Sequence, residues 1–151
     1  TTDRLPLLGA AAPLDDEDRI RLRHGSCADE VLMLAQADRT LAAPLAGAGH
    51  YITAEAVHAV THQGALDLDD ILSRRLRVSI ETADRGRTAA VAIATLVAPV
   101  LGWSEARAAE ELQRYIRLRD AEAAAETAPD DAAAAAAYRS VMEGQTRAPG
   151  P

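Results

Sequence analysis

Residues 53–77 read TAEAVHAVTHQGALDLDDILSRRLR, and this stretch decides the fold class. Thr53 suits the N-cap of a helix that runs to about Gly64, because a threonine hydroxyl can accept from the free N–H groups of a first turn. Asp67 or Asp69 begins a second helix, in which apolar residues recur at helical spacing. The stretch therefore predicts two amphipathic helices separated by a glycine break. The apolar residues of the second helix are Leu68, Ile71, Leu72 and Leu76.

Further segments on both sides of this stretch carry local signals. Residues 15–24 place acids before arginine and histidine, which is the order that the helix dipole favours. We expect that helix to end at Gly25, with Ser26 as the cap of the next helix. Residues 39–49 contain a proline and two glycines and predict a loop. Residues 77–81 alternate polar and apolar side chains, which indicates a short strand or an extended segment.

The C-terminal half predicts three more helices. Asp84 or Arg85 begins one that closes at Gly102 and is apolar around most of its girth, so we expect it at the centre of the core. Ser104 caps the next helix, and an alanine-rich stretch after Pro129 forms the last. The apolar residues of the central helix are Val91, Ile93, Leu96, Val97, Val100 and Leu101.

Together these patterns predict an all-α fold, a single compact bundle of about six or seven helices without a repeat. Residues 1–14 show no period and predict a linker or docking arm. Residues 15–143 would form the helical domain, and residues 144–151 a disordered tail. The chain begins with threonine, so we expect a processed chain or part of a longer one.

Composition narrows the functional classes. The 151 residues carry a net charge of −7, and the acidic balance argues against a nucleic-acid partner. A single cysteine, Cys27, excludes an intrachain disulfide and fits a reducing compartment. No apolar run approaches the roughly 20 residues that a membrane helix needs. No glycine-rich dinucleotide loop follows a strand, so we expect no FAD site in this chain.

Two polar groups could suggest a metal site. His58 and His62 lie four residues apart and share a helix face, as metal ligands can. The sequence offers no convincingly spaced third ligand, so we expect a packed or partly exposed pair and no metal. Asp67, Asp69 and Asp70 lack the spacing of a calcium loop, and we expect them to cap the helix.

Three arginines lie at the C-terminal end of the second predicted helix. Arg74 lies four residues after Asp70 and should face the acidic, exposed side. Arg75 falls on the apolar stripe, where a guanidinium must reach solvent or find a carboxylate. We expect its partner to be Glu55 or a domain outside this chain, with plain extension into solvent as the alternative. Arg77 is the third arginine of the group. Separately, no nucleophile stands in a recognisable motif, so we expect no catalytic residue in this chain.

The order of these motifs resembles a known family. AEAVHAVTHQGALDLDDILSRRLRVSIE at 54–81 precedes DRGRTAA at 84–90 and LGW at 101–103. Upstream, LPLLGA at 5–10 and RLRHGSCADEVL at 21–32 extend the series. The whole is similar to the C-terminal helical domain of FAD-dependent glycerol-3-phosphate dehydrogenases and α-glycerophosphate oxidases. Four positions depart from the family pattern: Gln63 replaces glutamate, Leu76 replaces threonine, and His24 and His58 stand where tyrosine is common.

The resemblance implies a function for the parent enzyme. It would oxidise sn-glycerol 3-phosphate to dihydroxyacetone phosphate and pass electrons through FAD to a quinone, or to oxygen in the oxidases. The flavin and phosphate sites of that family lie in the preceding domain, so this chain should be a cap domain that is inactive alone and holds no cofactor. Expected partners are the missing N-terminal FAD domain and, as a further option, a second copy. Expected localisation is cytoplasmic, at the inner membrane face through the parent enzyme only.

Five residues are candidates for structural or interdomain roles under this reading. His62 corresponds to the histidine of the family motif and would be structural. A free-standing helical module for protein interaction or regulation is the alternative function. The candidates are Glu55, His62, Arg74, Arg75 and Arg77.

Overall fold

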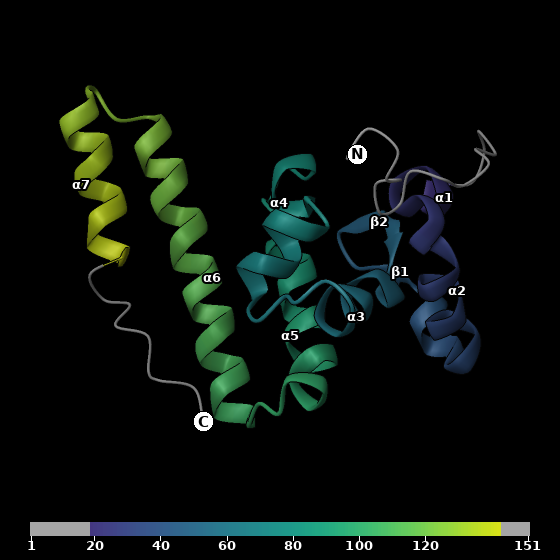
Figure 1. The fold of residues 1–151 in the computed structure, drawn as a ribbon. Helices are drawn as coiled ribbons and strands as arrows, with labels where there is room; N and C mark the ends of the chain where they lie inside the picture. The colour runs from purple at the N-terminus through teal and green to yellow at the C-terminus, as the bar shows by residue number, and fades with distance from the viewer. Residues whose placement is uncertain (1–18, 143–151) are drawn as a thin grey trace, which may run out of the picture.

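A computed structural model describes residues 19–142 (Figure 1). The expected linker at 1–14 and the tail at 144–151 lie outside the described residues. Seven α-helices and one small antiparallel hairpin follow in the described chain, which confirms the all-α class. The elements are α1 (Arg19–His24), η2 (Gly25–Cys27), α2 (Ala28–Ala37), η3 (Arg39–Ala42), β1 (Pro44–Leu45), β2 (Ala48–Ile52), α3 (Thr53–Thr61), η4 (Asp70–Arg75), α4 (Val78–Glu81), α5 (Arg87–Leu101), α6 (Glu105–Glu126) and α7 (Asp131–Met142).

The helices form a layered arrangement around a central core. In Figure 1, α6 and α7 run antiparallel at one side, α1 and α2 lie at the other, and α3, α4 and α5 lie between them. The core lies in this middle region, and α6 adds Tyr115 to it. No side chain described in α7 is buried, so α7 covers α6 without entering the core. The largest core residues are Leu45, Tyr51, Leu68, Ile71, Leu72, Leu76, Ile93 and Tyr115.

Two expected helix starts shift along the chain. Helix α3 begins at Thr53 itself, so Thr53 is not the N-cap. Its hydroxyl instead donates to the carbonyl of Leu41 at 2.8 Å, and the Glu55 carboxylate accepts from the N–H of Ile52 at 2.9 Å. Ser26 lies inside the 3₁₀ turn η2 and does not cap α2, which begins at Ala28. The 3₁₀ turn displaces the start of α2, while α3 begins directly after strand β2.

The second helix of the opening stretch contains a π-turn. The N–H of Leu76 donates to the carbonyl of Ile71 at 2.8 Å, five residues back. This wider turn brings Leu76 onto the same buried side as Ile71, with exposed fractions of 1% and 0%. Arg75 is thereby displaced from the apolar stripe and is exposed. The expected position of Arg75 on that stripe is wrong, because the expectation assumed α-helical spacing.

Two short segments differ from their expected structure. Residues 39–49 are not a plain loop but hold η3 and most of the hairpin, in which Pro44 pairs with Ile52. Residues 77–81 hold no strand. Arg77 adopts φ 67°, and its carbonyl then accepts from the N–H groups of the short helix α4. Val78 is buried whereas Ile80 is 68% exposed, so these two residues do not share one face as they would in a strand.

Helix α5 is buried on one side only. Ile93 and Val97 are fully buried, whereas Val91 and Val100 are 55% and 43% exposed. The expectation that α5 is surrounded by core is therefore wrong for these two valines. Gly102 ends the helix at φ 67°, as the sequence predicts.

The start of α5 is fixed by a close contact with α6. Gly86 adopts φ 76°, and a Cβ built there would lie 2.9 Å from the hydroxyl oxygen of Tyr115. That hydroxyl donates to the carbonyl of Arg85 at 2.7 Å, and burial raises the pKa of Tyr115 to about 12. Asp84 accepts from the N–H of Thr88 at 2.8 Å. These contacts join the first turn of α5 to the middle of α6.

Candidate functional site

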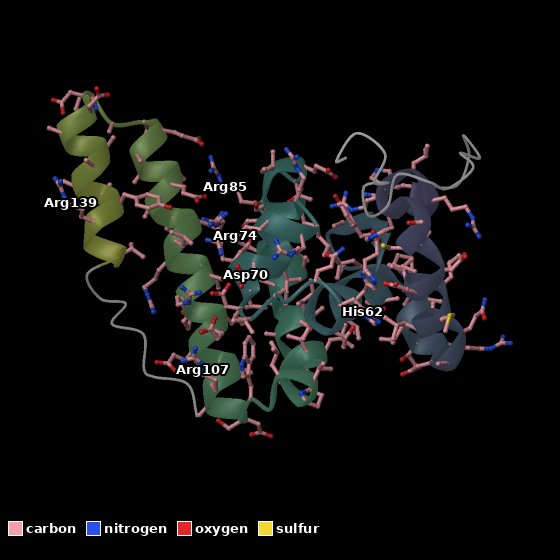
Figure 2. All side chains as sticks on the ribbon, in the orientation of Figure 1. His62, Asp70, Arg74, Arg85, Arg107 and Arg139 are labelled. Carbon is pink, nitrogen blue, oxygen red and sulfur yellow. The ribbon has the colours of Figure 1, made fainter. Side chains whose placement is uncertain are left out.

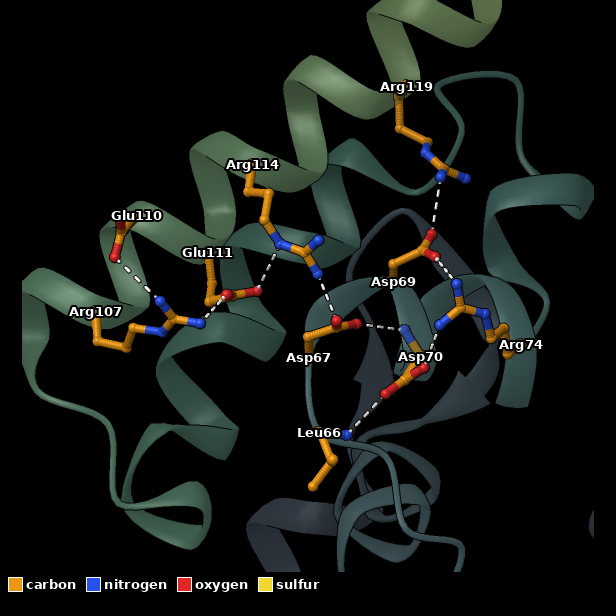
Figure 3. Close-up of polar contacts among 10 residues, drawn as sticks. All are labelled: Leu66, Asp67, Asp69, Asp70, Arg74, Arg107, Glu110, Glu111, Arg114 and Arg119. Carbon is orange, nitrogen blue, oxygen red and sulfur yellow. Dashed lines mark hydrogen bonds and ion pairs between the residues drawn. The ribbon is translucent and has the colours of Figure 1, made fainter. Parts of the chain in front are cut away.

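A network of acids and arginines joins η4 to α6 (Figure 3). Arg119 donates to the Asp69 carboxylate at 2.8 Å and to the Ser73 hydroxyl at 3.0 Å. Arg119 is 4% exposed and also lies 3.0 Å from Glu122. Arg119 was not predicted as a site residue, although it lies four residues after Tyr115 on the same helix face. A charge at that position signals a buried ion pair.

Asp67 and Asp70 perform the capping role expected from the sequence. The expected cap at Asp69 is wrong, because its carboxylate pairs with Arg119 and makes no cap hydrogen bond. Asp67 accepts from the N–H of Asp70 at 2.8 Å, and its second oxygen pairs with Arg114 of α6. Asp70 accepts from the N–H of Leu66 at 3.0 Å and pairs with Arg74, four residues on. The Arg74 guanidinium also lies 3.0 Å from the Asp69 carboxylate. The acids therefore begin the helix and hold α6 against it.

A cavity of about 560 Å³ lies beside this network, between α4, α6 and α7. Figure 2 shows Arg74 and Arg85 near α6 in this part of the molecule. Each of its three arginines already holds a carboxylate. Arg74 pairs with Asp69 and Asp70, Arg85 with Glu122 and Glu126, and Arg119 with Asp69 and Glu122. The cavity therefore offers an anion no uncompensated positive charge.

Glu55 is the centre of a second cluster, which we call the Glu55 cluster: Glu55, Arg19, Arg23 and His24. The Glu55 side chain is fully buried, and His24 Nε2 lies 3.0 Å from its carboxylate. Arg19 and Arg23 lie 3.8 Å and 3.6 Å from it. Both guanidinium groups also stack over the Tyr51 ring. The cluster binds α1 to α3, and α1 itself contains no buried residue.

Arg75 does not pair with Glu55, which corrects the partner expected from the sequence. The Nε atom of Arg75 donates to the carbonyl of Gln63 at 3.1 Å. The Glu55 carboxylate pairs with the cationic side chains of α1 instead. The π-turn explains the difference, because it displaces Arg75 from the buried side of the helix. The side chain of Arg77 is exposed. Arg75 and Arg77 thus present positive charge at the surface.

The two histidines of α3 are brought together with a third residue that the sequence analysis did not find. The rings of His58 and His62 stack, with centroids 4.7 Å apart and an interplanar angle of 13°. His58 Nε2 lies 2.8 Å from the carboxylate of Glu30 in α2. Burial lowers the pKa of His58 below its usual value. His62 lies on the α3 side of the molecule, away from the labelled arginines (Figure 2).

An apolar groove of about 560 Å³ runs between α5 and α6. We call it the α5/α6 groove. It includes the exposed Val91 and is bordered at the helix ends by Trp103. A groove of this kind suits contact with another protein surface. Its lining residues are Val91, Ala94, Thr95, Ala98, Pro99, Trp103, Glu105, Ala108, Ala109 and Leu112.

Comparison with known proteins gives the class to which this chain belongs. A family described as the C-terminal domain of alpha-glycerophosphate oxidase matches residues 1–108. The chain therefore belongs to this family of helical C-terminal domains. No solved structure gave a significant match. In residues 19–142, no helix has both the length and the apolar character required of a membrane span.

Two relatives name the proteins that carry such a domain. The chain is 42% identical over 112 residues to glycerol-3-phosphate dehydrogenase 2 of Mycobacterium tuberculosis, covering 74% of this chain and 19% of the relative. It is 41% identical over 125 residues to glycerol-3-phosphate dehydrogenase of Mycobacterium leprae, covering 83% and 21%. The chain thus spans about a fifth of the length of these relatives. These matches support the assignment of the chain to the C-terminal part of a glycerol-3-phosphate dehydrogenase, and they do not favour a free-standing module.

Proposed function

We propose that the chain is the C-terminal cap domain of an FAD-dependent dehydrogenase that oxidises sn-glycerol 3-phosphate to dihydroxyacetone phosphate. The observation that carries this proposal is the 42% identity with a glycerol-3-phosphate dehydrogenase over most of this chain and about a fifth of that relative. In this arrangement FAD and substrate lie in the N-terminal domain. The cap domain braces that domain and has no activity alone. Electrons leave the flavin for a quinone, with oxygen as the alternative acceptor.

The α5/α6 groove is the surface that we assign to the N-terminal FAD domain. Burial of Val91 and of the groove's apolar lining would contribute roughly 25 cal/mol for each Å² removed from water. This occupant fits because most of the length of the relatives lies outside the region that the chain matches.

The five candidate residues divide into two roles. Glu55 and Arg74 find partners within this domain, so we assign them to its internal support. His62 also belongs to the internal packing, through its stack with His58. Arg75 and Arg77 are exposed, and we assign them to contact with carboxylates of the FAD domain. Contact with the cytoplasmic face of the inner membrane, and any pairing of copies, would come through the parent enzyme.

The proposed activity is tested with the full-length parent enzyme. It should purify with a flavin absorbance band and reduce a quinone analogue only when sn-glycerol 3-phosphate is added. A second form that lacks the segment homologous to this chain should lose that activity or its bound FAD. A full-length enzyme with no response to the substrate would refute the activity, and full activity without the segment would refute the supporting role.

The docking surface is tested separately in the same enzyme. Val91→Asp places a charge in the groove and should lower quinone reduction at least tenfold or release FAD. Met33→Asp is the matched control, because Met33 is 65% exposed on α2, outside the groove. Equal activity of the two variants would remove the groove from the interface while leaving the enzymatic assignment intact. Arg77→Glu tests the charged part of the contact in the same way.

A further inference from the structure

We propose that Glu30, His58 and His62 bind one divalent transition-metal ion, of which zinc is the best match, and that the ion joins α2 to α3. The inference does not depend on the proposed enzymatic function. Each residue offers one ligand atom, and these three atoms lie within 4.8 Å of one another. Two imidazoles and one carboxylate form a ligand set that zinc uses, with the fourth position open to water.

The three ligand atoms are close enough for one ion, and the exposed His62 ring has to turn out of its stack on His58 so that both lone pairs meet at that ion. A point equidistant from three atoms 4.8 Å apart lies about 2.8 Å from each, so shifts of less than about 1 Å reach zinc distances of about 2.0–2.2 Å. The side chain of Glu30 is 46% exposed, and His62 is exposed as well. These two ligands can therefore adjust, while His58, at 1% exposure, fixes the position of the site.

The hydrogen bonds around His62 leave the correct nitrogen free for a metal. The Thr61 hydroxyl donates its only proton to the carbonyl of Val57 at 2.9 Å. It can then only accept from His62 Nδ1, which lies 2.7 Å away. Nδ1 of His62 therefore carries the proton, and Nε2 holds a lone pair. A metal-binding histidine commonly has its other nitrogen held in this way.

At His58, a metal ion would take the place of a proton. The Glu30 carboxylate accepts from His58 Nε2 at 2.8 Å, so the proton lies on Nε2 in the metal-free chain. On binding, that proton moves to Nδ1, the ring stays neutral, and the Nε2–carboxylate separation widens to about 3.3 Å around a tetrahedral ion. His58 Nδ1 is buried without a hydrogen-bond partner in the described chain, so neither tautomer loses a partner there.

The structural consequence is a link between two helices that are 28 residues apart along the chain at Glu30 and His58. His24, from α1, makes an edge contact with the His58 ring at a centroid distance of 5.6 Å and pairs with Glu55. His24 is engaged by Glu55 and is not required as a ligand. The sequence alone offered only the histidine pair, because Glu30 reaches it through packing of α2 on α3.

The test measures zinc binding to the chain without a polyhistidine tag after treatment with a chelator. Calorimetric titration with zinc chloride should give one ion per chain, and bound Co²⁺ should show the visible absorption of a four-coordinate ion. Glu30→Gln and His62→Asn should each weaken binding at least tenfold. Zinc should also raise the Tm of the wild-type chain but not of these variants.

His50→Asn is the matched control, since His50 is exposed on β2 outside the cluster. It should bind zinc as the wild type does. Circular dichroism of all variants establishes that they are folded. Absence of stoichiometric binding at micromolar free zinc would overturn the proposal, and so would equal affinities of the wild type and the folded His62→Asn variant.

Discussion

Arg119 of α6 donates to the carboxylate of Asp69, the residue before η4, at 2.8 Å, and the two residues are only 4% and 8% exposed. Both charges are taken out of water, and they are compensated by each other, by Ser73 and by Glu122. Such a pair contributes little compared with apolar packing, yet removing one partner leaves an uncompensated buried charge. The pair is therefore a sensitive point of the α6 contact.

Asp69→Ala should lower the free energy of unfolding by about 3 kcal/mol or more, because Arg119 would keep only Glu122 as a charge partner. Urea unfolding followed by circular dichroism measures the change. Asp120→Ala removes a carboxylate from an exposed pair with Arg87 and should cost less than about 1 kcal/mol. Equal costs for the two substitutions would contradict the buried role of Asp69.

Glu55→Ala should loosen α1 on α3. The substitution removes the carboxylate that Arg19, Arg23 and His24 share and leaves α1 with the stack on Tyr51 and the hydrogen bonds of Arg23. Hydrogen exchange should show faster exchange of the α1 amides, while amides in the middle of α5 keep their protection. Glu126→Ala, in an exposed pair with Arg85, serves as the control. Unchanged exchange in α1 would mean that other contacts hold it.

Gly86→Ala should destabilise the protein more than Gly102→Ala does. Both glycines have positive φ, at 76° and 67°, so each alanine bears a conformational cost of about 1–2 kcal/mol. Only at Gly86 does the new Cβ also collide, 2.9 Å from the Tyr115 hydroxyl and 3.3 Å from Val78. The hydrogen bond from Tyr115 to Arg85 would be lost, which adds about 1 kcal/mol. Thermal unfolding of the two variants compares the costs, and equal Tm losses would argue against the close contact.

Asp84 should make stability depend on pH in acid. Hydrogen bonds from Thr88, through its hydroxyl and its N–H, lower the pKa of Asp84 from 3.8 to about 2. Because the folded-state pKa is the lower one, the stabilisation is complete above pH 3.8 and is lost as the pH falls through about 2.

Asp84→Asn should therefore lower the Tm at neutral pH, and its difference from the wild type should shrink as the pH falls below about 3.8. Thr88→Val removes only the hydroxyl donor and should fall between the two proteins. Scanning calorimetry from pH 7 to about 2 measures these differences. A difference that stays constant over this range would show that the pKa of Asp84 is not lowered.

Local patterns sufficed to predict the helical class and several helix ends. The cap at Ser104, the stop at Gly102 and the caps at Asp67 and Asp70 all depend on neighbours within four residues. The π-turn, the hairpin and α4 could not be predicted in this way. They depend on the burial of Leu76 and other side chains against helices that are distant in the sequence.

The clusters were harder to predict for the same reason. Glu55 was expected only as the partner of Arg75, but its cationic partners come from α1. Glu30 carries no signal in the sequence, because its approach to His58 depends on the packing of α2. Arg119 could have been found from its helix face, since a charge aligned with Tyr115 points to a buried partner.

The hydrogen bond from Leu76 to Ile71 adds one residue to a helical turn and so changes which side chains after it face outward. A continuous α-helix through the same sequence would place Arg75 on the apolar stripe and Leu76 at the edge of that stripe. The distribution of positive charge on this face therefore depends on one backbone bond and not on the arginine content alone. Loss or gain of a single residue between 70 and 75 would change which charged side chains face solvent while leaving the composition almost unchanged.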